Sequence, residues 1–207
     1  MDTKAIVFDA YGTLFDVNSA AEKCKDKIGD QWEGFANFWR TTQLEYTWLR
    51  SLMKRHKDFW KVTEDSLDKS MKVFNIDMNM KKDLLNLYKI LSPYPEVKEV
   101  LGKLKDKGFK LAILSNGTQE LLNELVKSNK LDNLFDDLFS IEGVGIYKPD
   151  SRVYDMPIQK YGIEKTIKSL DGVFAFILHD KLENKTMIGR DPYGVRPLFI
   201  GKTKTNY

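Results

Sequence analysis

The sequence predicts an α/β fold in which a parallel sheet is interrupted by a helical insertion and followed by an antiparallel β meander. Three observations lead to this prediction: short apolar runs that end in polar loops, helical patterns between those runs, and closely spaced strands after about residue 162. Strands that alternate with helices form right-handed crossover units with parallel pairing, whereas strands joined by short turns pair antiparallel.

The parallel sheet is expected to contain three strands. Residues 5–8 form a continuous apolar run that leads into a polar loop. A second run covers residues 110–114 and ends in a polar turn, and a third covers residues 134–141 and is followed by a loop with two glycines. Continuous apolar runs of this length are typical of strands that are buried on both faces.

Helical patterns separate these strands. From about residue 20 to residue 91, apolar side chains recur at helical spacing, and we interpret this stretch as a helical insertion. The sequence Ser-Pro-Tyr-Pro at residues 92–95 then breaks the pattern, and residues 97–104 are expected to form an amphipathic helix of the core.

The last part of the chain is expected to be a meander of strands at residues 173–178, 186–188 and 197–200. Its exposed apolar faces would favour dimerisation or aggregation. The chain then divides into three parts: a core formed by residues 1–18 and 92–160, a helical insertion at 19–91 and a β-rich tail at 161–207.

Length and composition indicate a globular protein with one main core. The 207 residues are 42% hydrophobic and 30% charged, and the net charge of +3 is scattered along the chain, so we expect no nucleic-acid partner. Cys24 is the single cysteine, which excludes an intrachain disulfide and favours a reducing compartment. Because neither a secretory pattern nor a membrane span is evident, we expect a cytoplasmic location.

Polar residues follow each of the three expected strands. Asp9 follows the first, Ser115 and Asn116 end the second, and Lys148 lies in the loop after the third. Because the carboxyl ends of parallel strands meet at one edge of a sheet, these side chains are expected to converge. An ionised Asp beside a lysine ammonium can attack carbon or phosphorus. Spacing alone also allows Asp9 to cap a turn and Lys148 to be a surface charge.

Four stretches resemble motifs of the haloacid dehalogenase superfamily, and of its L-2-haloacid dehalogenases most of all. The first is Phe-Asp-Ala-Tyr-Gly-Thr-Leu-Phe-Asp-Val at residues 8–17, and the others lie at residues 38–50, 115–117 and 147–154. The resemblance covers residues 1–154. It implies a Rossmann-like core, a helical cap at residues 19–91, and hydrolytic removal of halide from 2-halocarboxylic acids.

The same resemblance implies a role for each site residue. Asp9 would displace the halide, water would cleave the resulting aspartyl ester, and Lys148 would keep Asp9 anionic. Thr13 and Ser115 would hydrogen-bond the nucleophile or the substrate carboxylate, and Arg40 would pair with the departing halide. The remaining lining would consist of the polar Asn116 and Tyr154 and the apolar Leu44, Phe59 and Trp60. Helix packing explains the three apolar residues equally well.

Tyr11 distinguishes between reactions within the superfamily. Its phosphatases carry a second Asp two residues after the nucleophile, which protonates a leaving oxygen. In this chain Tyr11 stands at that position, where it would contact the substrate. A halide leaves without protonation, so a tyrosine there favours carbon–halogen cleavage. We therefore expect neither a metal nor any other cofactor, and a small 2-halocarboxylic acid as the substrate.

The resemblance ends before the family's fourth motif, which supplies the serine, asparagine and aspartate that position the hydrolytic water. If residues 173–178 took the place of that strand, Gly172, Phe174 and Ile177 would stand where those polar groups belong. The stretch at about 160–201 instead resembles the class II glutamine amidotransferase domain of asparagine synthetases. That domain needs an N-terminal cysteine nucleophile, which does not match here, so we expect no catalysis by the tail.

Three hypotheses follow. The chain is a 2-haloacid dehalogenase, impaired where the fourth motif is missing; a phosphate-ester hydrolase of the same superfamily; or a non-catalytic chimera of a truncated dehalogenase and an amidotransferase fragment, joined between Tyr154 and Tyr161.

Overall fold

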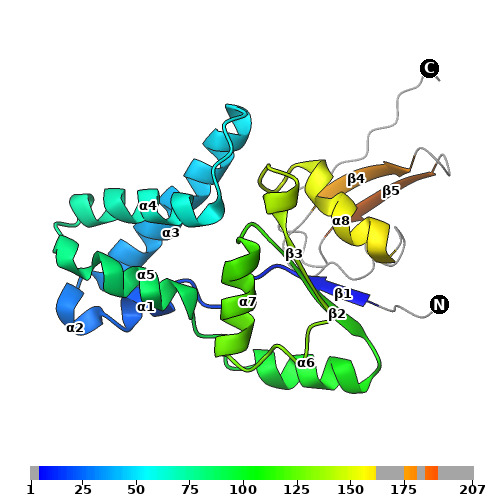
Figure 1. Cartoon of the computed structure of the whole chain (residues 1–207), viewed down its shortest axis with the longest axis horizontal. Coiled ribbons are helices and arrows are strands. Elements are labelled where there is room, and N and C mark those ends of the chain that lie inside the picture. Colours follow the sequence, from blue (N-terminus) through cyan, green and yellow to red (C-terminus); the bar gives the residue numbers. More distant parts are fainter. Residues whose placement is uncertain (1–4, 162–174, 181–184, 191–207) are drawn as a thin grey trace.

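The structure is a computed structural model that describes residues 5–161, 175–180 and 185–190. Figure 1 shows a sheet with its neighbouring helices α6, α7 and α8 and, beside them, a separate group formed by helices α1–α5. The elements in chain order are β1 (Ala5–Phe8), α1 (Ser19–Glu22), α2 (Lys25–Ile28), α3 (Trp32–Leu52), α4 (Phe59–Val73), η1 (Met78–Met80), α5 (Lys81–Lys89), α6 (Val97–Asp106), β2 (Lys110–Ser115), α7 (Gln119–Ser128), β3 (Asp137–Ser140), η2 (Ile141–Gly143), α8 (Ser151–Tyr161), β4 (Ala175–Asp180) and β5 (Lys185–Arg190).

The predicted three-stranded parallel sheet is present, in the order β1-β2-β3. Phe8 lies opposite Ile113, and Ser115 lies opposite Ser140, so the three strands end close to one edge. The central strand β2 is buried from its second residue to its last, as its continuous apolar run requires. The loops that follow the strands are thereby brought together.

Strand β3 is shorter than predicted, because it begins at Asp137 rather than at residue 134. Leu134 is still part of a turn, in which its N–H donates to the carbonyl of Leu131. Asp136 then joins the chain to β2: its N–H donates to the carbonyl of Leu111 at 2.7 Å, and its carboxylate accepts from the Leu111 N–H at 2.8 Å.

Helix α8 is fastened to the edge strand β3 at its C-terminal end. The Tyr161 hydroxyl and the Lys160 ammonium both donate to the Asp137 carboxylate. The ring of Tyr161 also meets that of Phe139 edge-on, with 6.1 Å between the centroids. These contacts hold the end of α8 against β3.

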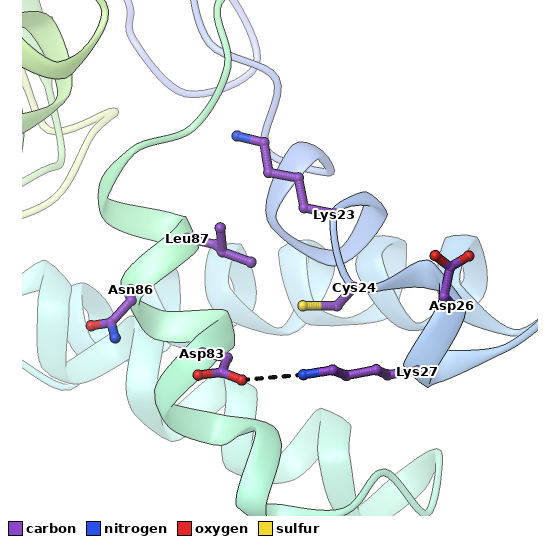
Figure 2. A pocket seen from close by; sticks show the side chains of 7 residues that line it. All are labelled: Lys23, Cys24, Asp26, Lys27, Asp83, Asn86 and Leu87. Atoms are coloured by element: carbon purple, nitrogen blue, oxygen red, sulfur yellow. Dashed lines mark ion pairs between the residues drawn. The ribbon is translucent and has the colours of Figure 1, made fainter.

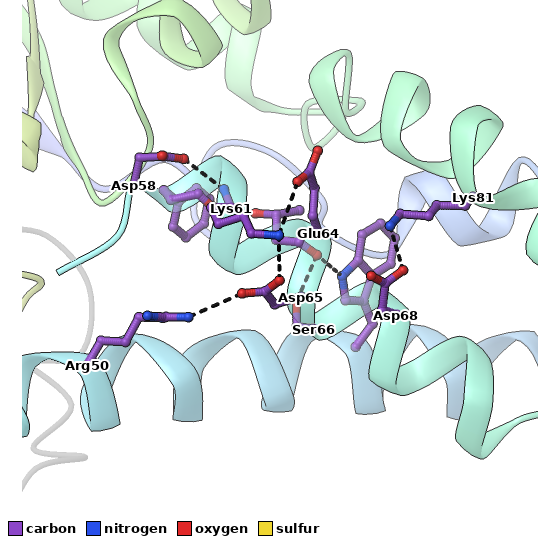
Figure 3. Close-up of polar contacts among 11 residues, drawn as sticks. Arg50, Asp58, Lys61, Glu64, Asp65, Ser66, Asp68 and Lys81 are labelled. Atoms are coloured by element: carbon purple, nitrogen blue, oxygen red, sulfur yellow. Dashed lines mark hydrogen bonds and ion pairs between the residues drawn. The ribbon is translucent and has the colours of Figure 1, made fainter. Parts of the chain in front are cut away.

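Helices α3 and α4 form the centre of the helical insertion. The Trp39 indole donates to the carbonyl of Thr63 at 3.2 Å, and Arg50 pairs with Asp65 at 3.2 Å. Figure 3 shows Asp65 between Arg50 of α3 and Lys61 of α4, and the Lys61 ammonium lies 2.8 Å from the Asp65 carboxylate. The fully buried apolar side chains of this region include Phe35, Phe59, Val62, Leu67, Met71 and Leu84. Within the described ranges, no helix has both the length and the apolar character needed to cross a bilayer.

The tail contains the predicted antiparallel pairing, between β4 and β5, with Ala175 opposite Arg190. These two strands form their own sheet, and among the described strands neither pairs with β1, β2 or β3. Residues 175–178, the described part of the predicted strand at 173–178, therefore do not extend the parallel sheet. The third predicted strand, at 197–200, lies outside the described residues, so the full meander stays a prediction.

Candidate active site

The side chains of Asp9 and Lys148 meet at the carboxyl edge of the sheet. The Lys148 ammonium lies 2.6 Å from Asp9 Oδ1, and the two side chains are 41% exposed at Asp9 and 18% exposed at Lys148. The predicted convergence of these two residues is thus found. The second carboxylate oxygen of Asp9 has no hydrogen-bond partner among the described residues, and the side chain is open enough for a small molecule to reach it.

Lys148 is held at both ends. Its ammonium also donates to the carbonyl of Leu114 at 2.5 Å, near the end of β2. Its backbone N–H donates to the Asn116 side-chain oxygen at 3.0 Å. In the structure the Asn116 oxygen fixes the loop that carries Lys148, and its predicted place in the polar lining stays a prediction. The ammonium therefore reaches Asp9 from a fixed backbone.

Ser115 is placed more deeply than its predicted contact with nucleophile or substrate requires. The residue is fully buried, and its Oγ accepts from the Gly117 N–H at 3.1 Å. Ser140, opposite it on β3, donates to the Gly117 carbonyl at 2.7 Å. The two serines thus hold the turn after β2. The Ser115 hydroxyl hydrogen has no acceptor in the described part of the chain, but the Oγ has no surface exposure.

Thr13 lies on the exposed side of the loop after β1. Its backbone N–H donates to the carbonyl of Ala10 at 3.3 Å, and within the described residues its hydroxyl makes no hydrogen bond. The loop turns at Gly12, where φ is +89°, a value that favours glycine. Of the two partners predicted for the Thr13 hydroxyl, Asp9 is not bonded in the structure. Binding of the substrate carboxylate stays a prediction.

Arg40 connects helix α3 to the loop after β1. One terminal nitrogen donates to the carbonyl of Tyr11 at 3.0 Å, and the other donates to the Gln43 side-chain oxygen at 2.8 Å. Arg40 was predicted to bind a departing halide. In the structure it joins the helical insertion to the loop that carries Asp9, and the Tyr88 hydroxyl also lies within its reach. Its binding of a halide stays a prediction.

Aromatic rings enclose the buried side of the loop. The Tyr11 ring lies 5.1 Å from that of Phe59 and 5.8 Å from that of Tyr88, measured between centroids. Burial, followed by the charge of Asp9, raises the pKa of Tyr154, so its hydroxyl stays protonated and can donate near the site. Phe59 is fully buried, which fits helix packing as well as pocket lining.

Leu44 and Trp60 are less closely tied to the site. Both are partly exposed, and Trp60 has the Lys89 ammonium 5.1 Å from its ring centroid. Neither has a described contact with Asp9 or Lys148. Their predicted place in an apolar wall stays a prediction.

Sequence reasoning missed the polar residues that join the helical insertion to the site. Gln43 is buried and bonds Arg40, and Glu142 accepts from both His56 and the Phe59 N–H, at 3.0 and 3.1 Å. A glutamine three residues after an arginine on a helix predicts a hydrogen bond between the two side chains, but the spacing does not show what else the arginine binds. The partners of Glu142 are more than 80 residues away along the chain and leave no local pattern.

A pocket of about 390 Å³ lies elsewhere, between α1, α2 and α5. Figure 2 shows the Lys27–Asp83 ion pair, at 3.5 Å, across it, and Cys24 at its wall. Burial raises the pKa of the Cys24 thiol, which disfavours the reactive thiolate. No residue of the Asp9 site lines this pocket. In the described part of the chain, no three His, Cys, Asp or Glu side chains are grouped to hold a metal, and metal independence stays a prediction.

Comparison with known proteins identifies the family. The model of the haloacid dehalogenase-like hydrolases matches residues 3–167. The chain belongs to this family. It is similar to (S)-2-haloacid dehalogenase 4A of Burkholderia cepacia, with 41% identity over 77% of this chain and 70% of that protein. It is also similar to (S)-2-haloacid dehalogenase 1 of Pseudomonas sp. strain CBS-3, with 42% identity over 77% of this chain and 71% of that protein.

Solved structures agree with the family assignment of this haloacid dehalogenase-like hydrolase. The L-2-haloacid dehalogenase of Xanthobacter autotrophicus with chloropropionic acid covalently bound superposes with a TM-score of 0.70 and 37% identity, over 77% of this chain and 65% of that one. A second family model, for a glutamine amidotransferase domain, matches residues 146–207 of the hydrolase. The two matched ranges overlap at residues 146–167, which include the predicted junction.

Proposed function

We propose that this hydrolase removes halide from L-2-halocarboxylic acids through an ester on Asp9, in the cytoplasm and without a cofactor. The observation that carries the proposal is the 2.6 Å contact between Lys148 and the half-exposed carboxylate of Asp9. A related dehalogenase whose structure has chloropropionic acid covalently bound supports a covalent intermediate.

In the first step, the unpaired oxygen of Asp9 attacks C2 of the substrate from the side opposite the halogen. A carbon–oxygen bond forms as the carbon–halogen bond breaks, the halide leaves with the bonding electrons, and the configuration at C2 inverts. Arg40 offers N–H groups to the departing anion, and Lys148 holds Asp9 in place. Thr13 and Tyr154, whose hydroxyls make no hydrogen bond within the described residues, would bind the substrate carboxylate.

In the second step, water attacks the carboxylate carbon of the ester, releasing the 2-hydroxy acid and a proton and restoring Asp9. We propose that this step is impaired, because the family's serine, asparagine and aspartate of the fourth motif do not match in this chain. Nor does any described strand pair with β1 on the side away from β2, so the described sheet places no further polar residues beside Asp9 there. The ester is then expected to accumulate.

Cleavage of a phosphate ester is the less favoured reaction. An alkoxide leaving group must be protonated, and the position two residues after Asp9 holds a tyrosine whose pKa is raised well above its usual value by burial and by Tyr88. Tyr11 is only 5% exposed and is enclosed by Phe59 and Tyr88, so it is a poor general acid.

We further propose that the tail is an amidotransferase-like fragment without catalysis of its own, and that its apolar strands favour dimerisation. The match to a glutamine amidotransferase domain supports the origin of the tail. The single cysteine, Cys24, lies far outside the matching range and is buried, so it cannot serve as that family's nucleophile.

Halide release tests the proposal. The purified chain is incubated with L- and D-2-chloropropionate, with and without magnesium, and chloride is measured over time. We expect at least one chloride per chain from the L enantiomer, none from the D enantiomer, and no effect of magnesium. Asp9→Asn should release none, while Asp132→Asn, an exposed loop variant, should match the unchanged protein. Magnesium-dependent release of phosphate from a phosphate ester would instead favour the second function, and no release of either kind would favour the non-catalytic chimera.

A further inference from the structure

Gln43 stands at the centre of a buried hydrogen-bond network outside the residues assigned to the reaction. It is 1% exposed, and its side chain bonds Arg40 on its own helix, Thr63 on α4 and Tyr88 on α5. Gln43 is therefore the point where all three helices are joined to the arginine that touches the Asp9 loop. A buried amide with all of its groups paired fixes a geometry more strictly than apolar packing does.

Chemistry determines the direction of the bonds from Arg40 to Gln43 and from Gln43 to Thr63, whereas the Tyr88 hydroxyl lies within hydrogen-bonding distance of both the nitrogen and the oxygen of the Gln43 amide, at 3.0 and 3.1 Å. An arginine donates and cannot accept, so the atom of Gln43 that faces Arg40 must be the oxygen, at 2.8 Å. The amide nitrogen then faces Thr63 Oγ1 at 2.7 Å and the Tyr88 hydroxyl at 3.0 Å. Thr63 passes its own hydrogen to the carbonyl of Phe59 at 2.8 Å. The chain of donors thus runs from Arg40 to α4 in one orientation.

The other end of Arg40 lies against the nucleophile loop. Its second terminal nitrogen donates to the carbonyl of Tyr11, two residues after Asp9. Gln43 therefore fixes one end of the guanidinium while Tyr11 receives the other. Without the Gln43 side-chain oxygen, the guanidinium of Arg40 would have no hydrogen-bond acceptor on α3.

We propose that Gln43 is a positioning residue for the Asp9 site: it holds Arg40 against the loop after β1 and so sets where the halide-binding N–H groups lie. This proposal rests on the proposed dehalogenation. Gln43 acts through Arg40 and does not touch the substrate. A displaced guanidinium would weaken stabilisation of the leaving halide and slow ester formation by roughly 10- to 100-fold, as misplacement of a catalytic group by about 1 Å does.

The test compares Gln43→Met with Gln43→Glu. Methionine keeps the volume but removes every hydrogen bond, whereas glutamate keeps an oxygen for Arg40. Ser70→Ala is the matched control, because Ser70 is a fully buried hydroxyl on α4 that bonds only the Ser66 carbonyl among the described residues. The first-order rate of chloride release is measured at saturating and at limiting L-2-chloropropionate, together with hydrogen exchange of the amides at residues 11–15.

We expect Gln43→Met to lose roughly 10- to 100-fold in the saturated rate and to exchange the loop amides faster, while Gln43→Glu stays within a few-fold of the unchanged protein and Ser70→Ala matches it. Wild-type rate and loop protection in a folded Gln43→Met would overturn the proposal, and so would equal losses in Gln43→Met and Gln43→Glu. If the unchanged protein released no chloride, the dehalogenation would fail, and the exchange experiment alone would decide whether Gln43 positions the loop.

Discussion

The Lys148 ammonium lies 2.6 Å from Asp9 Oδ1, although 139 residues separate the two along the chain. Three parallel strands make this contact, because their ends share one edge of the sheet. The same ammonium is held by the Leu114 carbonyl of the strand between them. The charge pair is therefore built from all three strands of the core, and it does not depend on the tail.

Replacing Lys148 tests its electrostatic role. Lys148→Met leaves the Asp9 carboxylate without its cation, and we expect the rate of halide release to fall by about 100-fold or more, as when a preorganised charge-stabilising donor is removed. The control is Lys98→Met, an exposed position on α6. The rate is measured by chloride release under single-turnover conditions. A rate in Lys148→Met within a few-fold of the control would show that the contact is not used.

Asn116 is expected to matter through the backbone that it fixes. In Asn116→Ala the Lys148 N–H loses its acceptor, and we expect the free energy of unfolding to fall by about 1 kcal/mol. Chloride release should slow as well, because the loop of Lys148 is no longer fixed. Urea denaturation and the chloride assay measure the two effects. Asn133→Ala, an exposed variant, should change neither, and a stable but slow Asn116→Ala would point to direct contact with substrate.

Two glycines give a matched pair for stability. A Cβ at Gly117 would lie 2.9 Å from Tyr11 Cε2, and Tyr11 cannot move freely because it is stacked on Tyr88. We expect Gly117→Ala to lower the free energy of unfolding by about 1–3 kcal/mol. Gly102, inside α6, has no atom within 4 Å of an added Cβ, so Gly102→Ala should raise it by about 0.5–1 kcal/mol. Urea denaturation checks both, and equal effects would contradict the packing described around Tyr11.

Asp136 predicts a pH dependence of stability. Burial by itself would raise the pKa of this carboxyl, but the hydrogen bonds from Lys105 and the Leu111 N–H outweigh burial and lower it. A group whose folded pKa is depressed contributes stability above its unfolded pKa of about 3.9 and loses it as pH falls through the folded pKa. Asp136→Asn should therefore destabilise the protein at pH 7, and the difference should shrink as pH falls below about 4. Urea denaturation at several pH values measures it, and a constant difference would rule out the linkage.

Much of the core could be predicted because its signals are local. The apolar runs that become β1 and β2 are continuous, and polar residues stand directly after them, so the positions of Asp9 and Ser115 at strand ends followed from the pattern. The start of β3 did not, because Leu134 and Phe135 are apolar yet lie before the strand, Leu134 in a turn. A pattern of apolar residues does not reveal that the Leu111 N–H, at the start of β2, is bonded by the Asp136 side chain and not by a backbone carbonyl of β3.

The side-chain roles were harder to predict because they depend on partners distant in sequence. Asn116 and Arg40 were both assigned to substrate or halide, and each first bonds backbone that carries another site residue. Ser115 was predicted to hydrogen-bond the nucleophile or the substrate carboxylate, but it is fully buried, opposite Ser140 in the pairing of β2 and β3. The two hydrogen bonds join residues 32 and 29 positions apart, and no spacing along one element encodes such contacts.

Covalent labelling of Asp9 tests the central claim most directly. The purified chain is incubated with L-2-chloropropionate, digested, and the peptide containing Asp9 is weighed by mass spectrometry, with Asp9→Asn treated in parallel. We expect the Asp9 peptide to gain the mass of one propionate group in ester linkage and to keep it long enough for detection, because hydrolysis of the ester is impaired. Asp9→Asn should show no gain. A label on another residue, or an unlabelled Asp9 peptide in a folded chain that releases no chloride, would contradict the account.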